Sequence, residues 1–254
     1  MRIKLVLAYE GTRYHGWQLQ KDTMTIQEVV EQALAKICDH KIRVHGSGRT
    51  DAGTHALGQV AHFDPPDSKA HIPWQRALNS VLPESVRVVK SCQVDREFHA
   101  RFSALSKTYS YTLWTEQDFV YPHRRRYVWK TGPLDMEAMT LACRHITGIH
   151  DFKSFMNAGT PVANTRRRVF SAGLCEGFHP CELVFMIKAD GFLKQMVRNI
   201  VGSLVAIGRG KFPPEHMAEI LDFRNRSLAP PTAPARGLCL ERVEYPPAHQ
   251  KKKT

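Results

Sequence analysis

The pattern of apolar and polar positions predicts an alternation of short strands and amphipathic helices. Residues 2–9 (RIKLVLAY) alternate with the period of a half-buried strand. Residues 25–28 (TIQE) have the form of a capping box, in which Thr25 caps a helix and Glu28 follows three residues later. Apolar residues then recur at helical spacing to about residue 40. This helix should therefore pack one face on a sheet.

The remaining pattern predicts similar elements in both halves of the chain. In the first half we expect a short strand at 42–45, a glycine-rich loop at 46–56, a strand at 58–63, a helix at 73–82 and a strand at 86–94. In the second half we expect strands at 107–114, 168–175, 183–189 and 237–243, and helices at 135–146, 192–207 and 214–223. Both halves therefore mix strands with helices.

This repeated order predicts an α+β fold made of two similar ferredoxin-like or RRM-like halves. Their antiparallel sheets are expected to join into one extended sheet, with a binding cleft between the halves. We place the N-terminal half at residues 1–105 and the C-terminal half at residues 106–246. Residues 247–254, which include three lysines, are expected to form a disordered basic tail.

The charge of the chain favours a polyanionic partner. Lys and Arg number 36 against 24 Asp and Glu, which gives a formal net charge of +12. A basic protein with dispersed charges would fit that number equally well. The arginines, however, group at residues 124–126 and 166–168, next to Tyr and Phe, and this grouping is typical of a nucleic-acid-binding face. Lysines 251–253 fit a solvated tail.

The cysteines and the hydropathy pattern indicate a cytoplasmic protein without a membrane partner. The six cysteines form no C-x-x-C pair, no signal peptide precedes them, and reduced thiols are the simplest interpretation. No apolar run is long enough to cross a bilayer. Among the 13 histidines, no set has the spacing of metal ligands, so we expect no metal site.

The glycine-rich loop at residues 46–56 (GSGRTDAGTHA) concentrates polar side chains between two expected strands. One interpretation is a tight connection in which glycines supply positive φ and Asp51 makes a local turn bond. Taken alone, this loop favours that interpretation. The other is a loop whose backbone approaches a ligand while Arg49, Asp51 and His55 project into one place.

Five stretches, in order, resemble the tRNA pseudouridine synthase A family. Residues 48–55 (GRTDAGTH) are similar to its active-site signature. The other four are residues 9–18 (YEGTRYHGWQ), residues 98–103 (FHARFS) leading into 107–109 (KTY), residues 196–202 (MVRNIVG), and residues 232–238 (TAPARGL). The resemblance extends from Leu5 to Pro246. Departures are small: Thr54 stands where Val is expected, and Glu10 where Asp is commoner.

The resemblance implies an isomerase that converts uridine to pseudouridine at positions 38, 39 and 40 in the anticodon stem-loop of tRNA. It also implies a homodimer, with tRNA lying across both subunits, and Asp51 as the essential carboxylate. The reaction breaks the bond from C1′ of the ribose to N1 of uracil and rejoins the base through C5. Because no group is lost and no electrons are transferred, we expect no cofactor.

Arg198 is the second candidate for the catalytic site. The expected helix around it carries apolar residues on almost every side, which indicates a buried helix. A buried arginine has to be paired because it cannot lose its charge. The resemblance points to Asp51 as the partner, and the alternative is a salt bridge of purely structural use.

Three further residues are candidates for substrate binding. Tyr109, on an expected strand, is either core packing or, by resemblance, a contact to the flipped target base. Arg49 either fills the gap in the RNA stack, binds a phosphate, or lies on the surface beside a turn. His55 is either polar packing or an RNA contact. Trp17 is either core or an RNA platform, and the sequence does not decide between them.

Two other functions fit parts of the sequence. An RNA-binding protein or chaperone without chemistry would explain the charge, although it would not need Asp51, Tyr109 and Arg198 together. A hydrolytic enzyme that uses histidines, such as a nuclease, is the third possibility. Chelator treatment and the length of the RNA product would distinguish a nuclease from an isomerase.

Overall fold

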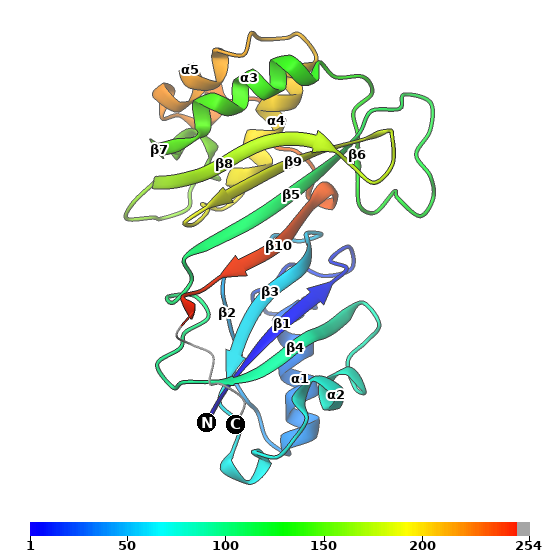
Figure 1. The fold of residues 1–254 in the computed structure, drawn as a ribbon, viewed down its shortest axis with the longest axis vertical. Coiled ribbons are helices and arrows are strands. Elements are labelled where there is room, and N and C mark those ends of the chain that lie inside the picture. Colours follow the sequence, from blue (N-terminus) through cyan, green and yellow to red (C-terminus); the bar gives the residue numbers. More distant parts are fainter. Residues whose placement is uncertain (248–254) are drawn as a thin grey trace. The chain divides into compact units, whose positions relative to one another are not determined.

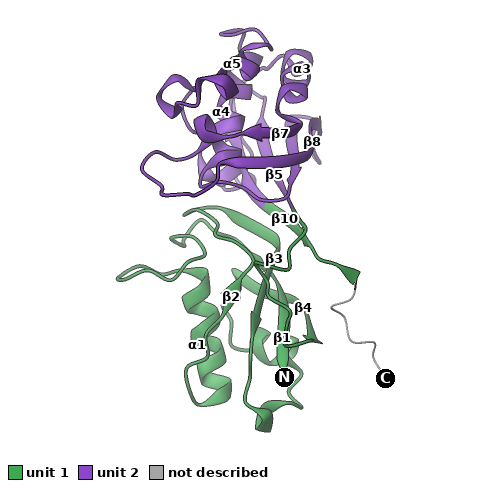
Figure 2. Cartoon of the chain, turned by 90° about the vertical axis from the view of Figure 1, so that its left-hand side faces the viewer, with its two compact units in different colours: residues 1–106, 240–254 green, residues 107–239 purple. Residues whose placement is uncertain are grey.

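The computed structural model describes residues 1–247 and contains two compact units (Figures 1 and 2). Unit 1 comprises residues 1–106 together with the chain from Leu240 onward, and unit 2 comprises residues 107–239. The C-terminal strand thus groups with the N-terminal unit, whereas the expected second half ran to residue 246. The final lysines lie outside the described residues.

Unit 1 is built around the central strand β1 (Arg2–Tyr9), which pairs antiparallel with β3 (His55–Phe63) and with β4 (Val86–Val94). The short β2 (His45–Gly46) pairs with the end of β3, and β10 (Leu238–Glu244) lies next to β3 in the sheet order. Helices α1 (Ile26–Cys38) and α2 (Trp74–Asn79) contact each other, and α2 packs on β4.

Unit 2 has the strand order β5-β9-β8-β7. These strands are β5 (Ser106–Trp114), β9 (Glu182–Ala189), β8 (Arg166–Glu176) and β7 (Gly148–Asp151), with all neighbours antiparallel. The two-residue β6 (Trp129–Lys130) pairs parallel with β5. Helix α3 (Met136–Ile146) contacts β8 and also α4 (Met196–Gly208) and α5 (His216–Phe223).

The expected α+β class with two mixed halves is confirmed. The joining of the two sheets and the cleft between the halves stay predictions. Within the described residues, no helix is both long enough and apolar enough to span a bilayer.

Three local expectations were wrong, each for a physical reason. Residues 42–44 form no strand, because the backbone N–H of Val44 donates to the Glu31 carboxylate (3.0 Å) and its carbonyl accepts from the Gln27 amide (3.1 Å) on α1. Helix α4 begins at Met196 and not at residue 192, since Gln195 has a left-handed backbone (φ 62°). Strands β6 and β7 were missed because they are too short to show a period.

Thr25 caps α1 as the sequence predicts, since its fully buried hydroxyl accepts a hydrogen bond from the backbone N–H of Glu28 (3.3 Å). Thr25→Ala removes this acceptor, and we expect the free energy of unfolding to fall by about 1 kcal/mol. Thr25→Ser keeps the oxygen and is the matched control. Urea denaturation of the three proteins measures the effect, and equal stability of the Ala and Ser variants would contradict it.

Candidate active site

The glycine-rich loop runs from the end of β2 to the start of β3, and buried polar bonds fix its first part. The backbone N–H of Ser47 donates to the carbonyl of Val60 (2.7 Å), and the Ser47 hydroxyl donates to the amide oxygen of Gln59 (2.7 Å). The Gln59 amide nitrogen donates to the carbonyl of Gly48 (3.0 Å). Because Ser47 and Gln59 are fully buried, these bonds hold the loop to β3 with little freedom.

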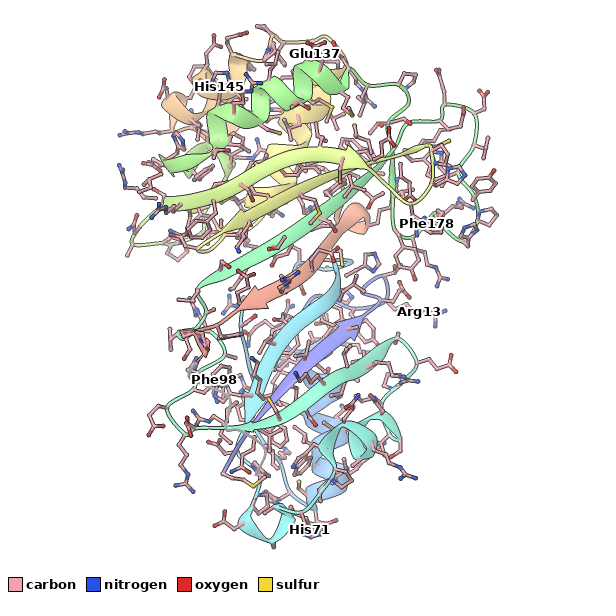
Figure 3. The ribbon with its side chains drawn as sticks, in the orientation of Figure 1. Arg13, His71, Phe98, Glu137, His145 and Phe178 are labelled. Carbon is pink, nitrogen blue, oxygen red and sulfur yellow. The ribbon has the colours of Figure 1, made fainter. Side chains whose placement is uncertain are left out.

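A second loop, residues 10–18, braces the first one. The backbone N–H of Trp17 donates to the carbonyl of Thr50 (3.1 Å), and the backbone N–H of Gly53 donates to the carbonyl of Tyr14 (3.2 Å). These two bonds fall on either side of Asp51. Arg13, which is labelled in Figure 3, is exposed on the same loop. The carboxylate-bearing turn is therefore held by backbone bonds to a neighbouring loop that precedes it by more than thirty residues of sequence.

Two glycines make this close approach possible. A Cβ on Gly11 would lie 2.0 Å from the carbonyl oxygen of Thr54, and a Cβ on Gly16 would lie 2.4 Å from that of Thr50. Gly16 also has a left-handed backbone (φ 84°), a conformation that residues other than glycine rarely adopt. Glycine is thus required at both positions, since the two loops meet backbone to backbone.

A buried tyrosine supports the residue before the carboxylate. The Tyr9 hydroxyl lies 2.9 Å from the Thr50 hydroxyl, and the Gln59 amide nitrogen lies 3.5 Å from the same Tyr9 oxygen. Tyr9 and Thr50 are 5% and 7% exposed, so the hydroxyl pair is shielded from water. Thr50, which precedes the turn that carries Asp51, is therefore fixed to a residue of β1.

Asp51 itself is half-buried and lies at the start of the turn. Its carbonyl accepts a hydrogen bond from the backbone N–H of Thr54 (3.1 Å), so Asp51 opens a tight turn as the sequence suggests. Arg49 is exposed, and its Nε donates to the side-chain oxygen of Gln18 (3.3 Å). The loop thus carries a half-buried carboxylate two residues after an exposed guanidinium.

His55 and Trp17 point into the interior of unit 1. The His55 ring is 5% exposed, and its Nδ1 accepts a hydrogen bond from the backbone N–H of Gly11 (3.1 Å). Trp17 is 2% exposed and packs at 6.4 Å from the Tyr9 ring centroid. Of the two interpretations for Trp17, the structure supports core packing. For His55 the geometry gives a brace between the two loops, and a contact to RNA stays a prediction.

Tyr109 and Arg198 both belong to unit 2. Tyr109 lies on β5, is 7% exposed, and packs edge-on against Phe192 with 5.0 Å between ring centroids. Arg198 lies in the first turn of α4 and its Nε donates to the carbonyl of Ala233 (2.8 Å). Helix α4 is buried on nearly all sides as expected, whereas Arg198 itself is half-buried. Its carbonyl contact holds the guanidinium near the start of the helix.

The arginine groups differ in how they are used. Arg124 is half-buried and forms an ion pair with the buried Glu182 (2.5 Å), so it serves the fold, whereas Arg125 and Arg126 are exposed. On β8, the alternation of the strand leaves Arg166 and Arg168 exposed. Exposed arginines are thus available on both segments for a polyanion.

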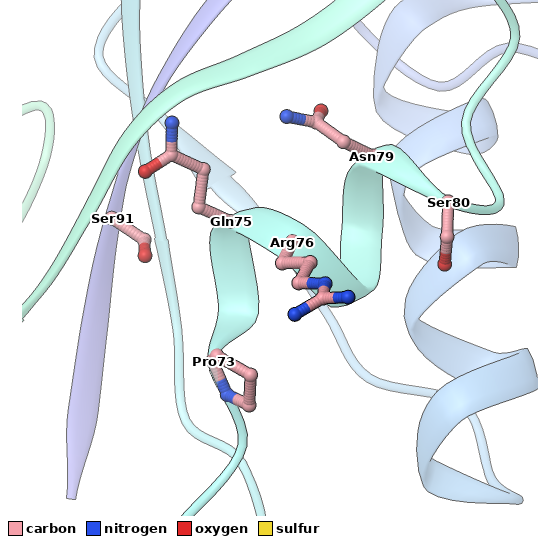
Figure 4. Close-up of a pocket in the computed structure, with 6 residues that line it drawn as sticks. All are labelled: Pro73, Gln75, Arg76, Asn79, Ser80 and Ser91. Carbon is pink, nitrogen blue, oxygen red and sulfur yellow. The ribbon is translucent and has the colours of Figure 1, made fainter.

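Two other kinds of site can be assessed in the described residues. Over residues 1–247, no three or more His, Cys, Asp or Glu side chains are grouped so that they could hold a metal ion. A shallow depression lies over α2 (Figure 4). Its Gln75 and Asn79 amides donate to the backbone carbonyls of Val89 (2.8 Å) and Val88 (2.9 Å), so these side chains tie α2 to β4.

Comparison with known proteins identifies the family. A family model described as tRNA pseudouridine synthase matches residues 5–103 and 142–246. A tRNA pseudouridine synthase A from Maridesulfovibrio salexigens is 50% identical over 244 residues, which span 96% of this chain and 90% of that protein. The chain belongs to the tRNA pseudouridine synthase family. The family resemblance inferred from the five sequence stretches is thereby confirmed.

Similar agreement extends across other members of the tRNA pseudouridine synthase family. A tRNA pseudouridine synthase A from Oleidesulfovibrio alaskensis is 47% identical over an alignment 268 residues long, which covers 96% of each chain. One from Chlamydia trachomatis is 43% identical over 254 residues, which span 98% of this chain and 94% of that protein. Both units of this chain therefore fall within the region that the family shares.

Sequence reasoning missed the residues that support the loop. Tyr9, Gly11 and Gly16 were noticed only as part of a matching stretch, and Ser47 and Gln59 were not singled out. The signal that could have found the glycines is their number in two separate polar loops, since glycines are needed where backbones touch. No local pattern, however, indicates which loop meets which.

Gly11→Ala tests the backbone contact between the loops. The added methyl group would overlap the carbonyl of Thr54, so we expect the free energy of unfolding to fall by about 2 kcal/mol, as in overpacked cores. Gly173→Ala is the matched control, because a Cβ there has no heavy atom within 4 Å. Urea denaturation compares them, and equal stability of the two variants would contradict the tight approach.

Proposed function

We propose that this chain is an isomerase that converts uridine to pseudouridine in the anticodon stem-loop of tRNA, at positions 38, 39 and 40. The observation that carries the proposal is the half-buried Asp51, on a loop that a neighbouring loop braces, in a family of tRNA pseudouridine synthases. Relatives that span nearly the whole chain are named for the same reaction on tRNA.

Asp51 supplies the carboxylate that the isomerisation needs. The C1′–N1 bond breaks, the uracil turns, and a C1′–C5 bond forms, while the proton on C5 is exchanged for one on N1, so the product has the composition of the substrate. A carboxylate beside the sugar serves as nucleophile or as general base in such a reaction. A fixed carboxylate is favoured because the base must leave and return to the same sugar carbon.

Arg198 and Tyr109 complete the proposed site from unit 2. With its Nε bound to the Ala233 carbonyl, the Arg198 guanidinium would hold the Asp51 carboxylate through its two terminal nitrogens. Tyr109, steadied by Phe192, would contact the extruded uracil and offset part of the stacking that the base loses.

The remaining residues bind the RNA or position the loop. Arg49 is exposed beside Asp51 and would contact the phosphate backbone or fill the place of the flipped base. The exposed arginines of residues 124–126 and 166–168 would bind phosphates elsewhere on the tRNA. We assign His55 to loop positioning, because its Nδ1 accepts from Gly11. A homodimer that works in the cytoplasm is part of the same proposal.

Asp51→Asn tests the chemistry. The amide keeps the shape of the side chain but removes its charge, so we expect unchanged tRNA binding and a loss of pseudouridine formation of at least about 1000-fold, since the reaction would have no nucleophile or base. Unmodified tRNA transcripts and position-resolved pseudouridine mapping measure both the site and the rate.

The matched control for that experiment is Asp135→Asn. Asp135 caps α3 through the backbone N–H of Ala138 (2.9 Å), and asparagine caps helices equally well. Turnover by the Asp51 variant at the wild-type rate would remove its assigned role. A wild-type protein that binds tRNA and yields no pseudouridine would instead indicate an RNA-binding protein without chemistry, and shortened RNA would indicate a nuclease.

Arg198→Lys tests the pairing with Asp51. Lysine keeps the charge but loses both the Nε contact to Ala233 and the planar pair of donors, so we expect kcat to fall by about 100-fold or more with a smaller change in KM. Arg87→Lys is the matched control, because the Arg87 guanidinium also binds backbone carbonyls, those of Leu82 (3.1 Å) and Pro83 (2.8 Å). Normal turnover in the Arg198 variant would refute the pairing.

A further inference from the structure

The segment of residues 98–103 (FHARFS) has no part in the chemistry proposed above, although it is one of the stretches that indicated the family. It forms a closed turn in unit 1. The backbone N–H of Ser103 donates to the carbonyl of His99 (2.9 Å), and the backbone N–H of His99 donates to the Ser103 hydroxyl (3.0 Å). Phe98, labelled in Figure 3, is fully buried and packs on Tyr245 at 5.0 Å.

Four aromatic rings form a row through this turn, which we call the ring row: His45, His62, His99 and Phe102. His45 and His62 are direct neighbours across β2 and β3, and their rings stack at 5.1 Å. His99 lies edge-on to His62 at 4.8 Å, and Phe102 stacks on His99 at 4.4 Å. His62 is 2% exposed, whereas His45 at one end of the row and Phe102 at the other are exposed, Phe102 by 77%. The row is therefore buried at His62 and reaches solvent at Phe102.

The two inner imidazoles of the ring row are held neutral. Nδ1 of His62 accepts from the backbone N–H of Ala100 (3.1 Å), and Nδ1 of His99 accepts from the backbone N–H groups of Arg101 (3.1 Å) and Phe102 (3.3 Å). Burial lowers the pKa of His62 to about 3 and also lowers that of His99. At neutral pH Phe102 is therefore backed by an uncharged flat ring.

The Phe102 end of the ring row combines an aromatic ring with a positive charge. Phe102 stacks on His99, and the exposed Arg101 guanidinium lies over the Phe102 ring, 5.6 Å from its centroid. A large apolar ring left 77% exposed gains little from burial, whereas an aromatic ring next to an arginine suits a nucleobase and its phosphate.

This end of unit 1 is distinct from the carboxylate-bearing turn. His55 and His62 lie on the same strand, β3, seven positions apart. At about 3.3 Å per residue, the strand separates them by roughly 23 Å. A nucleotide on Phe102 would therefore be a different one from the uridine at Asp51.

We propose that Phe102, backed by His99 and flanked by Arg101, is a second RNA contact that stacks one unpaired nucleotide of the substrate. The inference rests on the proposed function only in taking RNA as the substrate. The stacked base would continue the ring row beyond Phe102, and Arg101 would bind the phosphate that accompanies it. The site increases the affinity for the RNA and fixes where the RNA lies on the protein, and it takes no part in bond breaking.

Substitutions at Phe102 distinguish stacking from simple apolar cover. Phe102→Ala is expected to raise the Kd for an unmodified tRNA transcript by roughly 5- to 100-fold, the range for losing one base stack. Phe102→Leu keeps apolar volume without an aromatic face and should weaken binding almost as much, whereas Phe102→Trp should bind within about twofold of wild type. Phe223→Ala, at another exposed phenylalanine, is the matched control and should leave Kd unchanged.

Filter binding gives Kd, thermal melting checks the fold, and single-turnover pseudouridine mapping at saturating enzyme gives the rate. A Kd that rises in the order Trp, Leu, Ala, with a smaller effect on rate, supports the stacking site. Wild-type Kd in the Leu or Ala variant overturns it. Unchanged Kd with altered sedimentation would overturn it in favour of a contact between protein chains. If the Kd order holds but wild type forms no pseudouridine, the proposed chemistry fails and the stacking site stands.

Discussion

The backbone contact between two polar loops of unit 1 is the constraint on which the candidate site depends. The carbonyls of Thr50 and Thr54 lie where side chains on Gly16 and Gly11 would otherwise be. Because both positions are glycine, the Trp17 and Gly53 N–H groups can each bond across the loops on either side of Asp51. A turn fixed at both ends gives its carboxylate a defined place without needing a helix or strand of its own.

The same contact explains why so many polar groups are buried beside the turn. Tyr9, Thr50, Ser47 and Gln59 bond to one another or to the loop backbone, and each is at most 7% exposed. A buried network of this kind is costly when one member lacks a partner, and it tolerates few alternative arrangements when every member is bonded. The network therefore restricts the loop to one arrangement and fixes the position of the neighbouring Asp51. A reaction on one sugar carbon requires such a fixed position.

The fold could be predicted where a periodic pattern was long, and the site where chemistry singled out residue types. The bounds of β1 and β4 agree with those expected from alternation, since each strand has enough residues to show it. Residues 42–44 have the same apolar alternation, yet the Val44 backbone bonds to Gln27 and Glu31 of α1, a tertiary contact that no local pattern contains. The half-burial of Arg198 likewise depends on the contact of its Nε with Ala233, 35 residues away.

A stretch that identifies the family can serve the fold and need not contact the substrate, as residues 9–18 illustrate. Within that stretch Trp17 fills the core, Gly11 and Gly16 admit a neighbouring backbone, and Arg13 remains in solvent. Trp17, Gly11 and Gly16 do not have to touch a substrate to matter, since each contacts the loop that carries Asp51. Phe102 presents the opposite case: it contributes an exposed ring to its turn, and burial gives no reason for it. An exposed aromatic ring that burial does not explain is therefore a better pointer to a ligand than a residue that the core already explains.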